Sequence, residues 1–273
     1  MCLNRNSHLA AKISSATLAP VLLLGLASLA LPAWFWVAPG AEQRVASYGT
    51  SLRGRTWSQR YNAQLACRSL DGVVIQPGAI FSFNKTIKSW SLDDGYVKAP
   101  VSYGGELVRA YGGGVCQTST TFYNAALLAG MTALERHPHT FAAHYCPPGR
   151  DAAVAQYTID LRFKNPYTWP LKVKSQIRGD ELLVSLFAPQ APSEHAEIST
   201  EVLSTEFPAR LTLTAHGSKE SGGMSYLRSP GAVGYRVVTW RSFYRQGKET
   251  RRERLSDDSY DAMNRVVAFI DEK

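Results

Sequence analysis

The stretch Gly112-Gly113-Gly114-Val115-Cys116-Gln117 brings a cysteine to the start of a segment with helical periodicity. Beyond it, apolar side chains recur every three or four residues, at Phe122, Ala125, Ala126 and Ala129. This spacing predicts a helix that buries one face, and Gly130 is placed to end it. The predicted helix therefore carries the cysteine in its first turn.

A thiol in the first turn of a helix faces unpaired backbone N–H groups and the positive end of the helix dipole. These groups stabilise a thiolate and can lower the pKa of the thiol to between ~3.5 and ~7.5. Three consecutive glycines lose much conformational entropy on folding, so they are favoured only where the backbone needs unusual dihedral angles or close contact with another segment. Their presence before Cys116 therefore favours a special role for this residue. The alternative is that Cys116 packs in the core as a small hydrophobic residue.

The N-terminus predicts export from the cytosol. Residues 1–41 carry Arg5 and Lys12 but no acidic residue, and residues 13–37 are almost wholly apolar. The segment is long enough to span a bilayer, while small residues at 38–41 suit cleavage. We therefore expect residues 1–41 to be a signal peptide or an N-terminal membrane anchor. The rest of the chain is expected in the periplasm or on the extracytoplasmic face of the cytoplasmic membrane.

The charge and cysteine content follow from this location. The chain of 273 residues has a net charge of +8, which favours anionic envelope surfaces; export argues against nucleic acid as a partner. Beyond the N-terminal segment there are three cysteines, so oxidation to a disulfide leaves one thiol over. A Cys67–Cys146 disulfide with Cys116 free agrees with the glycine argument, although the other two pairings stay open.

Periodicity predicts an α+β fold. A helix is expected at 57–70, and strands are expected at 80–83, 157–163, 171–174, 182–187 and 210–214, with a hairpin across Gln246-Gly247. We expect short helices packed on an antiparallel β-sheet, followed by a β-rich C-terminal extension. The predicted segments are the N-terminal signal or anchor (1–41), a leading helical segment (42–69), a main domain (70–187), a linker (188–197) and the extension (198–273).

Histidines cluster after the predicted helix. His137, His139 and His144 fall within 30 residues of Cys116. Acyl transfer by a thiol needs an imidazole to carry its proton and a group that orients the imidazole. Cys116 would attack, His139 or His137 would be the base, and Asp151 would orient it. Backbone N–H groups at 113–116 would hold the oxyanion.

Two other interpretations of these histidines remain. His137 with His139, and His144 with Cys146, have a two-residue spacing that could place each pair on one strand face as zinc ligands. The spacing fits no standard zinc pattern and Pro138 interrupts a strand, so we expect no metal and no cofactor. The histidines could also simply bond to backbone groups beside turns.

The ordered motifs of the main domain resemble the VanW-type domain, named from glycopeptide-resistance gene clusters. They are Gly72, Pro77-Gly78, Phe81-Ser82-Phe83-Asn84, Gly95-Tyr96, the glycine-cysteine stretch, Tyr123-Asn124-Ala125, Glu135-Arg136-His137-Pro138-His139, Tyr145 and Gly149-Arg150-Asp151-Ala152. The resemblance implies a proposed activity, L,D-transpeptidation of peptidoglycan. It makes Cys116 the nucleophile and places the family histidine at His139, with His137 at a more variable position.

We therefore expect an L,D-transpeptidase-type cysteine acyltransferase whose partners are peptidoglycan stem peptides, and the membrane if the N-terminal segment is uncleaved. The alternative is a non-catalytic envelope protein that binds wall peptides or a partner, of the type associated with vancomycin resistance. The motif residues expected to contact substrate or the oxyanion are Gly112, Gly113, Gly114, Gln117, Tyr96, Arg136 and Tyr145. The oligomeric state is left open.

Overall fold

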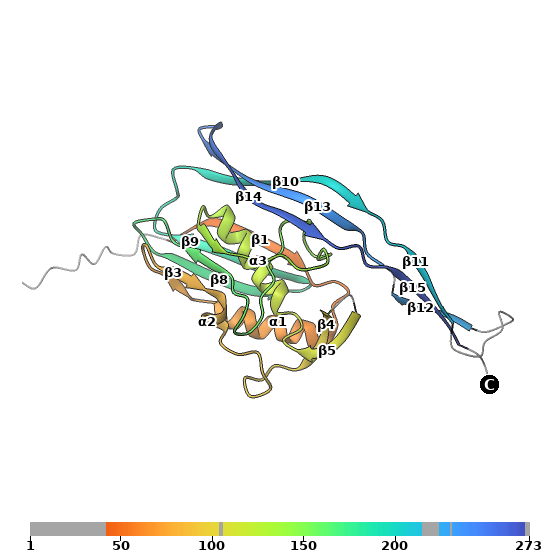
Figure 1. Ribbon diagram of the computed structural model, residues 1–273. Coiled ribbons are helices and arrows are strands. Elements are labelled where there is room, and N and C mark those ends of the chain that lie inside the picture. The colour runs from red at the N-terminus through yellow and green to blue at the C-terminus, as the bar shows by residue number, and fades with distance from the viewer. Residues whose placement is uncertain (1–41, 104–105, 215–223, 230, 271–273) are drawn as a thin grey trace, which may run out of the picture. The chain divides into compact units, whose positions relative to one another are not determined.

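The computed structural model describes residues 42–103, 106–214, 224–229 and 231–270 (Figure 1). The predicted signal peptide or anchor at 1–41 lies outside these residues. Within them, no helix has both the length and the apolar character needed to cross a membrane. Short helices and several antiparallel sheets make the fold α+β, as the sequence predicts.

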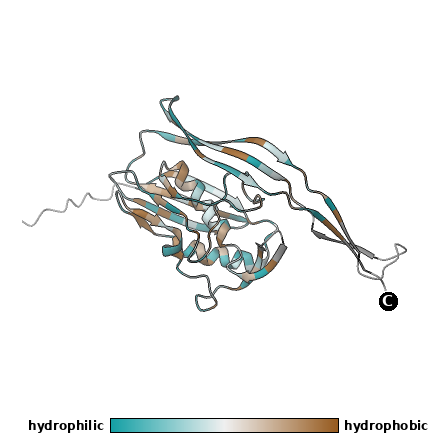
Figure 2. Cartoon of the chain, in the orientation of Figure 1, coloured by the Kyte–Doolittle hydropathy of each residue, from teal (hydrophilic) through white to brown (hydrophobic). Residues whose placement is uncertain are grey.

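The central sheet has four antiparallel strands and two helices packed on it. In spatial order the strands are β1 (Gln43–Ser51), β9 (Glu181–Ala188), β8 (Leu171–Arg178) and β2 (Val74–Ile75). Helices α1 (Trp57–Leu70) and α3 (Val115–Leu128) contact each other and the sheet (Figure 1). Hydrophobic residues concentrate in these elements (Figure 2). Strand β1 was not predicted, since residues 42–69 were expected to form a leading helical segment.

Helix α1 has the predicted bounds because local signals set both of its ends. The Thr56 side chain accepts a hydrogen bond from the backbone of Gln59, and the Gln59 side chain returns one to Thr56, which forms a capping box. At the other end Gly72 has φ of +81°, a conformation that suits glycine. The helix buries Cys67 and Leu70 in the core.

Helix α3 ends as predicted but is buried more completely than its apolar pattern indicates. The backbone N–H of Gly130 bonds to Leu127 and its φ is +76°. Polar residues of this helix are fully buried together with the apolar ones; they are Thr118, Ser119, Thr120, Thr121 and Asn124. The prediction of a single buried face was therefore too narrow. Hydrogen bonds satisfy the polar side chains, as between the hydroxyls of Thr121 and Thr50, 2.8 Å apart.

Shorter elements surround this core. They are β3 (Ile80–Ser82), α2 (Phe83–Ile87), β4 (Lys98–Tyr103), β5 (Glu106–Tyr111), β6 (Thr132–Glu135) and β7 (Arg162–Lys164). Strands β3, β7 and β6 form one sheet, and β4 pairs with β5. Phe83, predicted to end a strand, begins α2.

The predicted strand at 157–163 is wrong in its first half. Strand β7 covers only Arg162–Lys164, and Tyr157 is exposed with φ of +71°. The polar Asp160 within the predicted strand instead binds α2: its carboxylate accepts hydrogen bonds from the Ser82 hydroxyl (2.5 Å) and the Asn84 backbone (2.9 Å). The alternating pattern persists only at Leu161 and Phe163, which are buried.

The C-terminal part is β-rich, as predicted. Strands β10 (His195–Glu206), β13 (Gly234–Arg245) and β14 (Lys248–Tyr260) form an antiparallel sheet, and β11 (Arg210–Thr214), β15 (Arg265–Ile270) and β12 (Met224–Ser229) form another. The hairpin at Gln246 and Gly247 is confirmed, with positive φ at both residues. Strands β11 and β15 are parallel, an exception to the antiparallel prediction.

The predicted disulfide is wrong, because Cys67, Cys116 and Cys146 are all free thiols. Cys67 lies in the core between Ser175 of β8 and Thr118 of α3. Cys146 instead lies close to Arg150 and Asp151, in the part of the chain that follows the histidines. The two thiols have different surroundings and do not meet.

Candidate active site

The three glycines are required where the chain enters α3. Gly112 and Gly114 have φ of +83° and +112°, in the region that favours glycine. A Cβ on Gly113 would lie 2.7 Å from the carbonyl oxygen of Pro100, and one on Gly114 would collide with the carbonyl oxygen of Gln59 in α1. The glycines thus let α1 and β4 approach the backbone immediately before Cys116, which fixes the position of the thiol.

Cys116 is half-buried in the first turn of α3. Its Sγ lies 3.4 Å from the carbonyl oxygen of Val154, and the His139 side chain is close enough to lower the pKa of the thiol. Its backbone N–H donates to no acceptor in the described part of the chain. This free donor beside the thiol is suited to binding an oxyanion.

His139 is held by Asp151 through two contacts to one oxygen. The backbone N–H of His139 donates to Asp151 Oδ2 at 2.7 Å, and the ring Nδ1 lies 2.5 Å from the same atom. With Nδ1 engaged, Nε2 is the ring nitrogen left for the thiol. The His139 side chain is 26% exposed and that of Asp151 only 1%, so the ring has some access to solvent while its partner has almost none.

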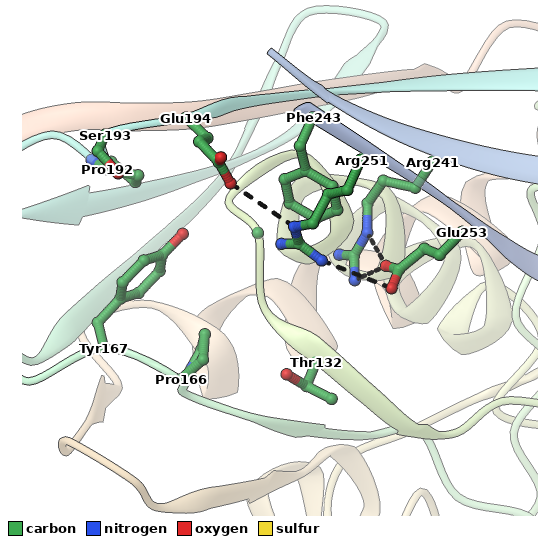
Figure 3. Close-up of a pocket in the computed structure, with 11 residues that line it drawn as sticks. Thr132, Pro166, Tyr167, Pro192, Ser193, Glu194, Arg241, Phe243, Arg251 and Glu253 are labelled. Atoms are coloured by element: carbon green, nitrogen blue, oxygen red, sulfur yellow. Dashed lines mark hydrogen bonds and ion pairs between the residues drawn. The ribbon is translucent and has the colours of Figure 1, made fainter. Parts of the chain in front are cut away.

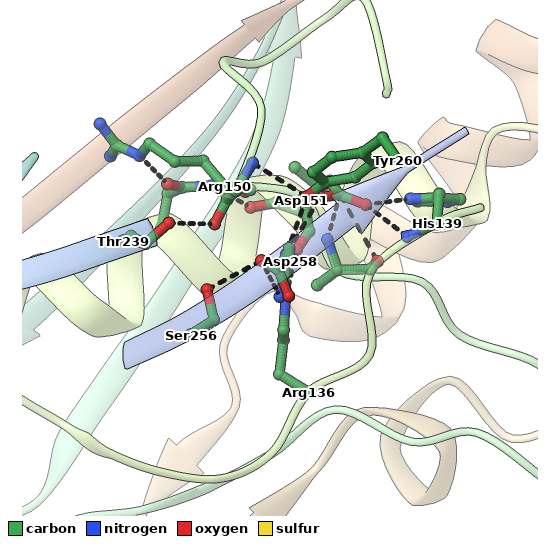
Figure 4. A network of polar contacts seen from close by, with 12 residues as sticks. Arg136, His139, Arg150, Asp151, Thr239, Ser256, Asp258 and Tyr260 are labelled. Atoms are coloured by element: carbon green, nitrogen blue, oxygen red, sulfur yellow. Dashed lines mark hydrogen bonds and ion pairs between the residues drawn. The ribbon is translucent and has the colours of Figure 1, made fainter. Parts of the chain in front are cut away.

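The second oxygen of Asp151 is also fully bonded (Figure 4). Its Oδ1 accepts from Arg136 Nη2 at 3.0 Å and from the Tyr260 hydroxyl at 2.5 Å. The Asp151 carboxylate therefore has a fixed orientation toward His139. Cys116, His139 and Asp151 form a thiol–imidazole–carboxylate chain, the arrangement used for nucleophilic catalysis.

The electrostatics favour charged forms of all three groups. Burial alone would lower the pKa of His139, but hydrogen bonds to Asp151 and Cys116 outweigh it and raise that pKa to about 10. Burial would raise the pKa of Cys116, yet the hydrogen bond and charge of His139 lower it below its ordinary value. The pKa of Asp151 is lowered despite burial, chiefly by His139. These shifts favour a thiolate–imidazolium pair beside a carboxylate.

Helix α3 also holds the segment that carries Asp151. The Ser119 hydroxyl donates to the carbonyl oxygen of Ala152 at 2.6 Å, and the Thr120 hydroxyl accepts from the Ala152 backbone N–H at 3.0 Å. The Asn124 amide donates to the carbonyl oxygen of Arg150 at 2.7 Å. These buried polar residues explain why α3 is not simply amphipathic: they fix the nucleophile and its carboxylate in one frame.

Gln117 and Tyr145 were both predicted as site residues and lie near Cys116. They contact Arg55, which was not predicted as a site residue. Gln117 Nε2 donates to Thr50 and Ser51 of β1, while its Oε1 accepts from Arg55 Nε at 3.0 Å. The Arg55 guanidinium lies 4.9 Å from the centre of the Tyr145 ring, and Tyr145 in turn interacts electrostatically with Cys116. Arg55 thus contacts both the residue that follows Cys116 in the chain and the ring of Tyr145.

Three other predicted residues lie elsewhere. His137 is 47% exposed and its Nε2 lies 3.4 Å from Glu135, so it is not part of the chain of three groups. Tyr96 is buried near Cys67 in the core. Arg136 is buried behind Asp151, where its donors bond to Asp151, Asp258 and Tyr260, and it does not face the thiol.

Neither a described cluster of metal-ligating side chains nor the cavity beside β13 and β14 includes these groups. In the described ranges, no three or more His, Cys, Asp or Glu side chains are placed to hold a metal ion. A cavity of about 220 Å³ lies between β13–β14 and the residues around Gly130 and Tyr167 (Figure 3). Its arginines, Arg241 and Arg251, are paired with Glu253 and Glu194. Because these charges are already paired, we place the candidate site at Cys116.

Sequence reasoning missed Arg55, Asp258 and Tyr260. No local motif marks Arg55 as a site residue, because its contacts with Gln117 and Tyr145, far along the chain, form only in the fold. Asp258 and Tyr260 belong to β14, which pairs with β13 in an ordinary strand pattern. No local signal distinguishes these three residues from the other arginines, aspartates and tyrosines of the chain.

The comparisons with known proteins agree with the resemblance. The family model described as "VanW like protein" matches residues 58–187. The uncharacterized protein YoaR of Bacillus subtilis (strain 168) is 33% identical over 164 residues, which cover 56% of this chain and 54% of that protein. The vancomycin B-type resistance protein VanW of Enterococcus faecalis (strain ATCC 700802 / V583) is 26% identical over 137 residues, 48% of this chain and 50% of that protein.

The chain thus spans about half the length of the curated relatives it matches. A solved IgA1 protease G5 domain covers 30% of this chain and 96% of its own, with 18% identity and a TM-score of 0.20, a likeness too weak to support any conclusion. Residues 58–187 match the VanW-like family model, so this part of the chain is a VanW-like domain.

Proposed function

We propose that this protein is an exported cysteine acyltransferase of the L,D-transpeptidase type that acts on peptidoglycan stem peptides. The observation that carries the proposal is the contact chain from Cys116 through His139 to Asp151 at the start of a buried helix. A thiolate with a paired imidazolium suits acyl transfer, because the first is the nucleophile and the second can protonate an amine that leaves.

In the proposed reaction, Cys116 Sγ attacks the carbonyl carbon of the third residue of the stem peptide. The backbone N–H of Cys116 donates to the oxyanion that forms. His139 then gives its proton to the nitrogen of the terminal D-amino acid, the C–N bond breaks, and a thioester remains on Cys116. An acceptor amine attacks the thioester and gives a proton to His139, and the new amide bond releases the thiolate. Asp151 stays ionised throughout and holds the ring.

The contacts of Arg55 favour a substrate that carries a carboxylate. Its Nε is bonded to Gln117, its ring partner is Tyr145, and it forms no ion pair with any residue that the structure describes. A half-buried guanidinium with free Nη donors matches the bidentate geometry of a carboxylate. Stem peptides present such a group at their terminal residue, next to the bond that would be broken.

Two further observations support the envelope setting. One relative is named as a vancomycin B-type resistance protein, and vancomycin resistance concerns the cell wall. The apolar segment at 13–37 with basic residues before it is typical of export. Both are consistent with a substrate in the wall, reached from the periplasm or from the outer face of the cytoplasmic membrane.

The test is mass spectrometry of the purified protein with a stem tetrapeptide and an amine acceptor. We expect a transient thioester on Cys116, release of the terminal D-amino acid, and a new amide product. Cys116→Ser should abolish all three, while Cys146→Ala should retain them. If the wild-type protein binds the peptide but forms neither adduct nor product, the protein is a binding protein and the proposal is wrong.

A further inference from the structure

The C-terminal strands bond to the candidate active site although they lie outside the VanW-like domain. The family match ends at residue 187, whereas Asp258 and Tyr260 belong to β14. Both side chains are buried, and Figure 4 shows them meeting Arg136 and Asp151 in one network. The VanW-like domain alone therefore does not contain every group that contacts the Asp151 carboxylate.

Tyr260 bonds to the Asp151 segment in two ways. Its hydroxyl donates to Asp151 Oδ1 at 2.5 Å and accepts from the backbone N–H of Gly149 at 2.9 Å. Burial and the negative charge of Asp151 raise the pKa of Tyr260, which keeps the hydroxyl protonated as a donor. One hydroxyl thus fixes the side chain of Asp151 and the backbone two residues before it.

Asp258 acts through Arg136. Its Oδ2 lies 2.6 Å from Arg136 Nη1 and accepts from the Ser256 hydroxyl at 2.8 Å. Arg136 uses its other donors on Asp151, with Nε bonded to the Asp151 carbonyl at 2.7 Å and Nη2 to Oδ1 at 3.0 Å. Arg136 is thus shared by two buried carboxylates, those of Asp151 and Asp258, while protonated His139 pairs with Asp151 and with the Cys116 thiolate. A buried cluster of this kind is stable only when each charge is paired.

The neighbouring strand anchors the same segment from its backbone. The Thr239 hydroxyl of β13 donates to the carbonyl oxygen of Gly149 at 3.1 Å. Arg241 of β13 donates to the carbonyl oxygens of Leu127 (3.1 Å) and Met131 (2.7 Å), where α3 ends. A cation at this end is favourable for the helix dipole. Strands β13 and β14 therefore hold both the carboxylate segment and the helix that carries Cys116.

We propose that β14 completes the active site, with Tyr260 and Asp258 as positioning residues that orient Asp151 toward His139. Oδ2 of Asp151 serves His139, and Oδ1 serves Tyr260 and Arg136, so the carboxylate cannot rotate without losing several bonds. If the Oδ1 partners are removed, the carboxylate gains freedom and its bond to Nδ1 weakens. His139 then holds its proton less tightly and stabilises the Cys116 thiolate less.

The consequence for catalysis rests on the proposed function, but the test needs only the thiol. The titratable and charged groups around Asp151 and His139 are Cys116, Tyr123, Arg136, Tyr145, Cys146, Asp258 and Tyr260. Tyr260→Phe removes one hydroxyl. Asp258→Asn removes one negative charge and keeps nearly the same size and shape of the side chain. Tyr235→Phe is the matched control, because Tyr235 lies opposite Tyr260 on β13 and its hydroxyl bonds to no described residue.

The experiment measures alkylation of Cys116 by iodoacetamide from pH 5 to 10 in the full chain, with peptide mass spectrometry as the readout. We expect Tyr260→Phe and Asp258→Asn to alkylate several-fold more slowly at pH 7 and to move the midpoint of the profile to higher pH. Tyr235→Phe should follow the wild-type profile. Thermal melting of each variant identifies any that is unfolded.

A folded Tyr260→Phe and a folded Asp258→Asn that both keep the wild-type profile would overturn the proposal, even if their melting temperatures fall. A variant that fails to fold is replaced by the other, since each tests the same carboxylate. Failure of the proposed function looks different. In that case the wild-type protein transfers no acyl group, while the alkylation profiles still separate Tyr260→Phe from Tyr235→Phe.

Discussion

Cys116 and Cys67 are the same side chain on neighbouring helices of one domain, yet their surroundings are opposite. Cys67 lies in the last turns of α1 with core residues around it, and burial raises its pKa to about 11. Cys116 lies in the first turn of α3, where His139 outweighs burial and lowers its pKa. The difference shows that burial acts against both thiolates and that only a paired cation reverses it.

Cys146 sharpens this comparison because it lies near the candidate site without such a partner. Burial, followed by the charge of Asp151, raises its pKa to about 12, although Arg150 and Arg136 act in the other direction. Nearby cations alone are therefore not sufficient to lower the pKa of a buried thiol. What distinguishes Cys116 is direct contact with an imidazole that a buried carboxylate keeps protonated.

The largest expected effect is selective alkylation of Cys116. A thiol with a pKa of about 11 is ionised only about one part in ten thousand at pH 7, whereas a thiol with a pKa below 9.0 is ionised at least about one part in a hundred. Cys67 and Cys146 should therefore react at least about a hundred-fold more slowly than Cys116. Brief iodoacetamide treatment of the native protein followed by peptide mass spectrometry measures the ratio. In urea all three should react alike, and equal rates in the native protein would remove the distinction.

The next effect comes from removing the imidazole with His139→Gln. The Cys116 pKa should rise above its ordinary value, because burial remains and the cation that opposes it is gone. We expect alkylation at pH 7 to fall at least about ten-fold and any acyl transfer to fall about 10²–10⁴-fold. The rates of alkylation and of acyl transfer, each measured across pH, test both expectations.

His137→Gln is the matched control for that variant. It replaces an exposed histidine two residues away, whose ring contacts Glu135. Its alkylation and transfer rates should remain close to those of the wild-type protein. If instead His137→Gln is the more damaging change, the assignment of the base to His139 is wrong.

Local signals explain what the sequence could predict. The bounds of α1 follow from Thr56, Gln59 and the apolar stripe, and the hairpin between β13 and β14 follows from Gln246-Gly247. Strand β1 was missed because its sequence has no clear alternation and its pairing with β9 lies far along the chain. Tyr157 was misread because alternation alone does not reveal that Asp160 binds α2.

The residues of the candidate site likewise separate into those that local sequence signals could predict and those that they could not. The combination of Cys116, His139 and Asp151 could be predicted, since nucleophile, base and carboxylate lie within one stretch of 36 residues and the chemistry requires those side-chain types. Arg55 and Tyr260 could not, because each reaches the site only through contacts between distant segments. A single sequence carries no record of those contacts.

A smaller effect concerns the peptide rather than the thiol, and it tests Arg55. A carboxylate bound by a half-buried guanidinium contributes about 1.5–3 kcal/mol, so we expect the wild-type protein to prefer a peptide with a terminal carboxylate over its carboxamide by about ten-fold or more. Arg55→Gln should lose that preference. Acylation rates, normalised to the alkylation rate of each variant, measure it, and an unchanged preference would exclude Arg55 as the carboxylate site.

The smallest effect is on stability, and it tests whether the pKa of His139 is raised in the native protein. A histidine with a raised pKa stabilises the fold below its ordinary 6.5 and loses this as pH rises, whereas a cysteine with a lowered pKa stabilises it above its ordinary 9.0. Between these values the native pair holds one proton, on His139, and the unfolded chain also holds one, on the thiol. The free energy of unfolding contributed by the pair should therefore be nearly flat from pH 6.5 to 9.0 in the wild-type protein. In Cys116→Ser only His139 titrates, so stability should fall across that range, and parallel curves from urea unfolding would show that the pKa of His139 is not raised in the variant.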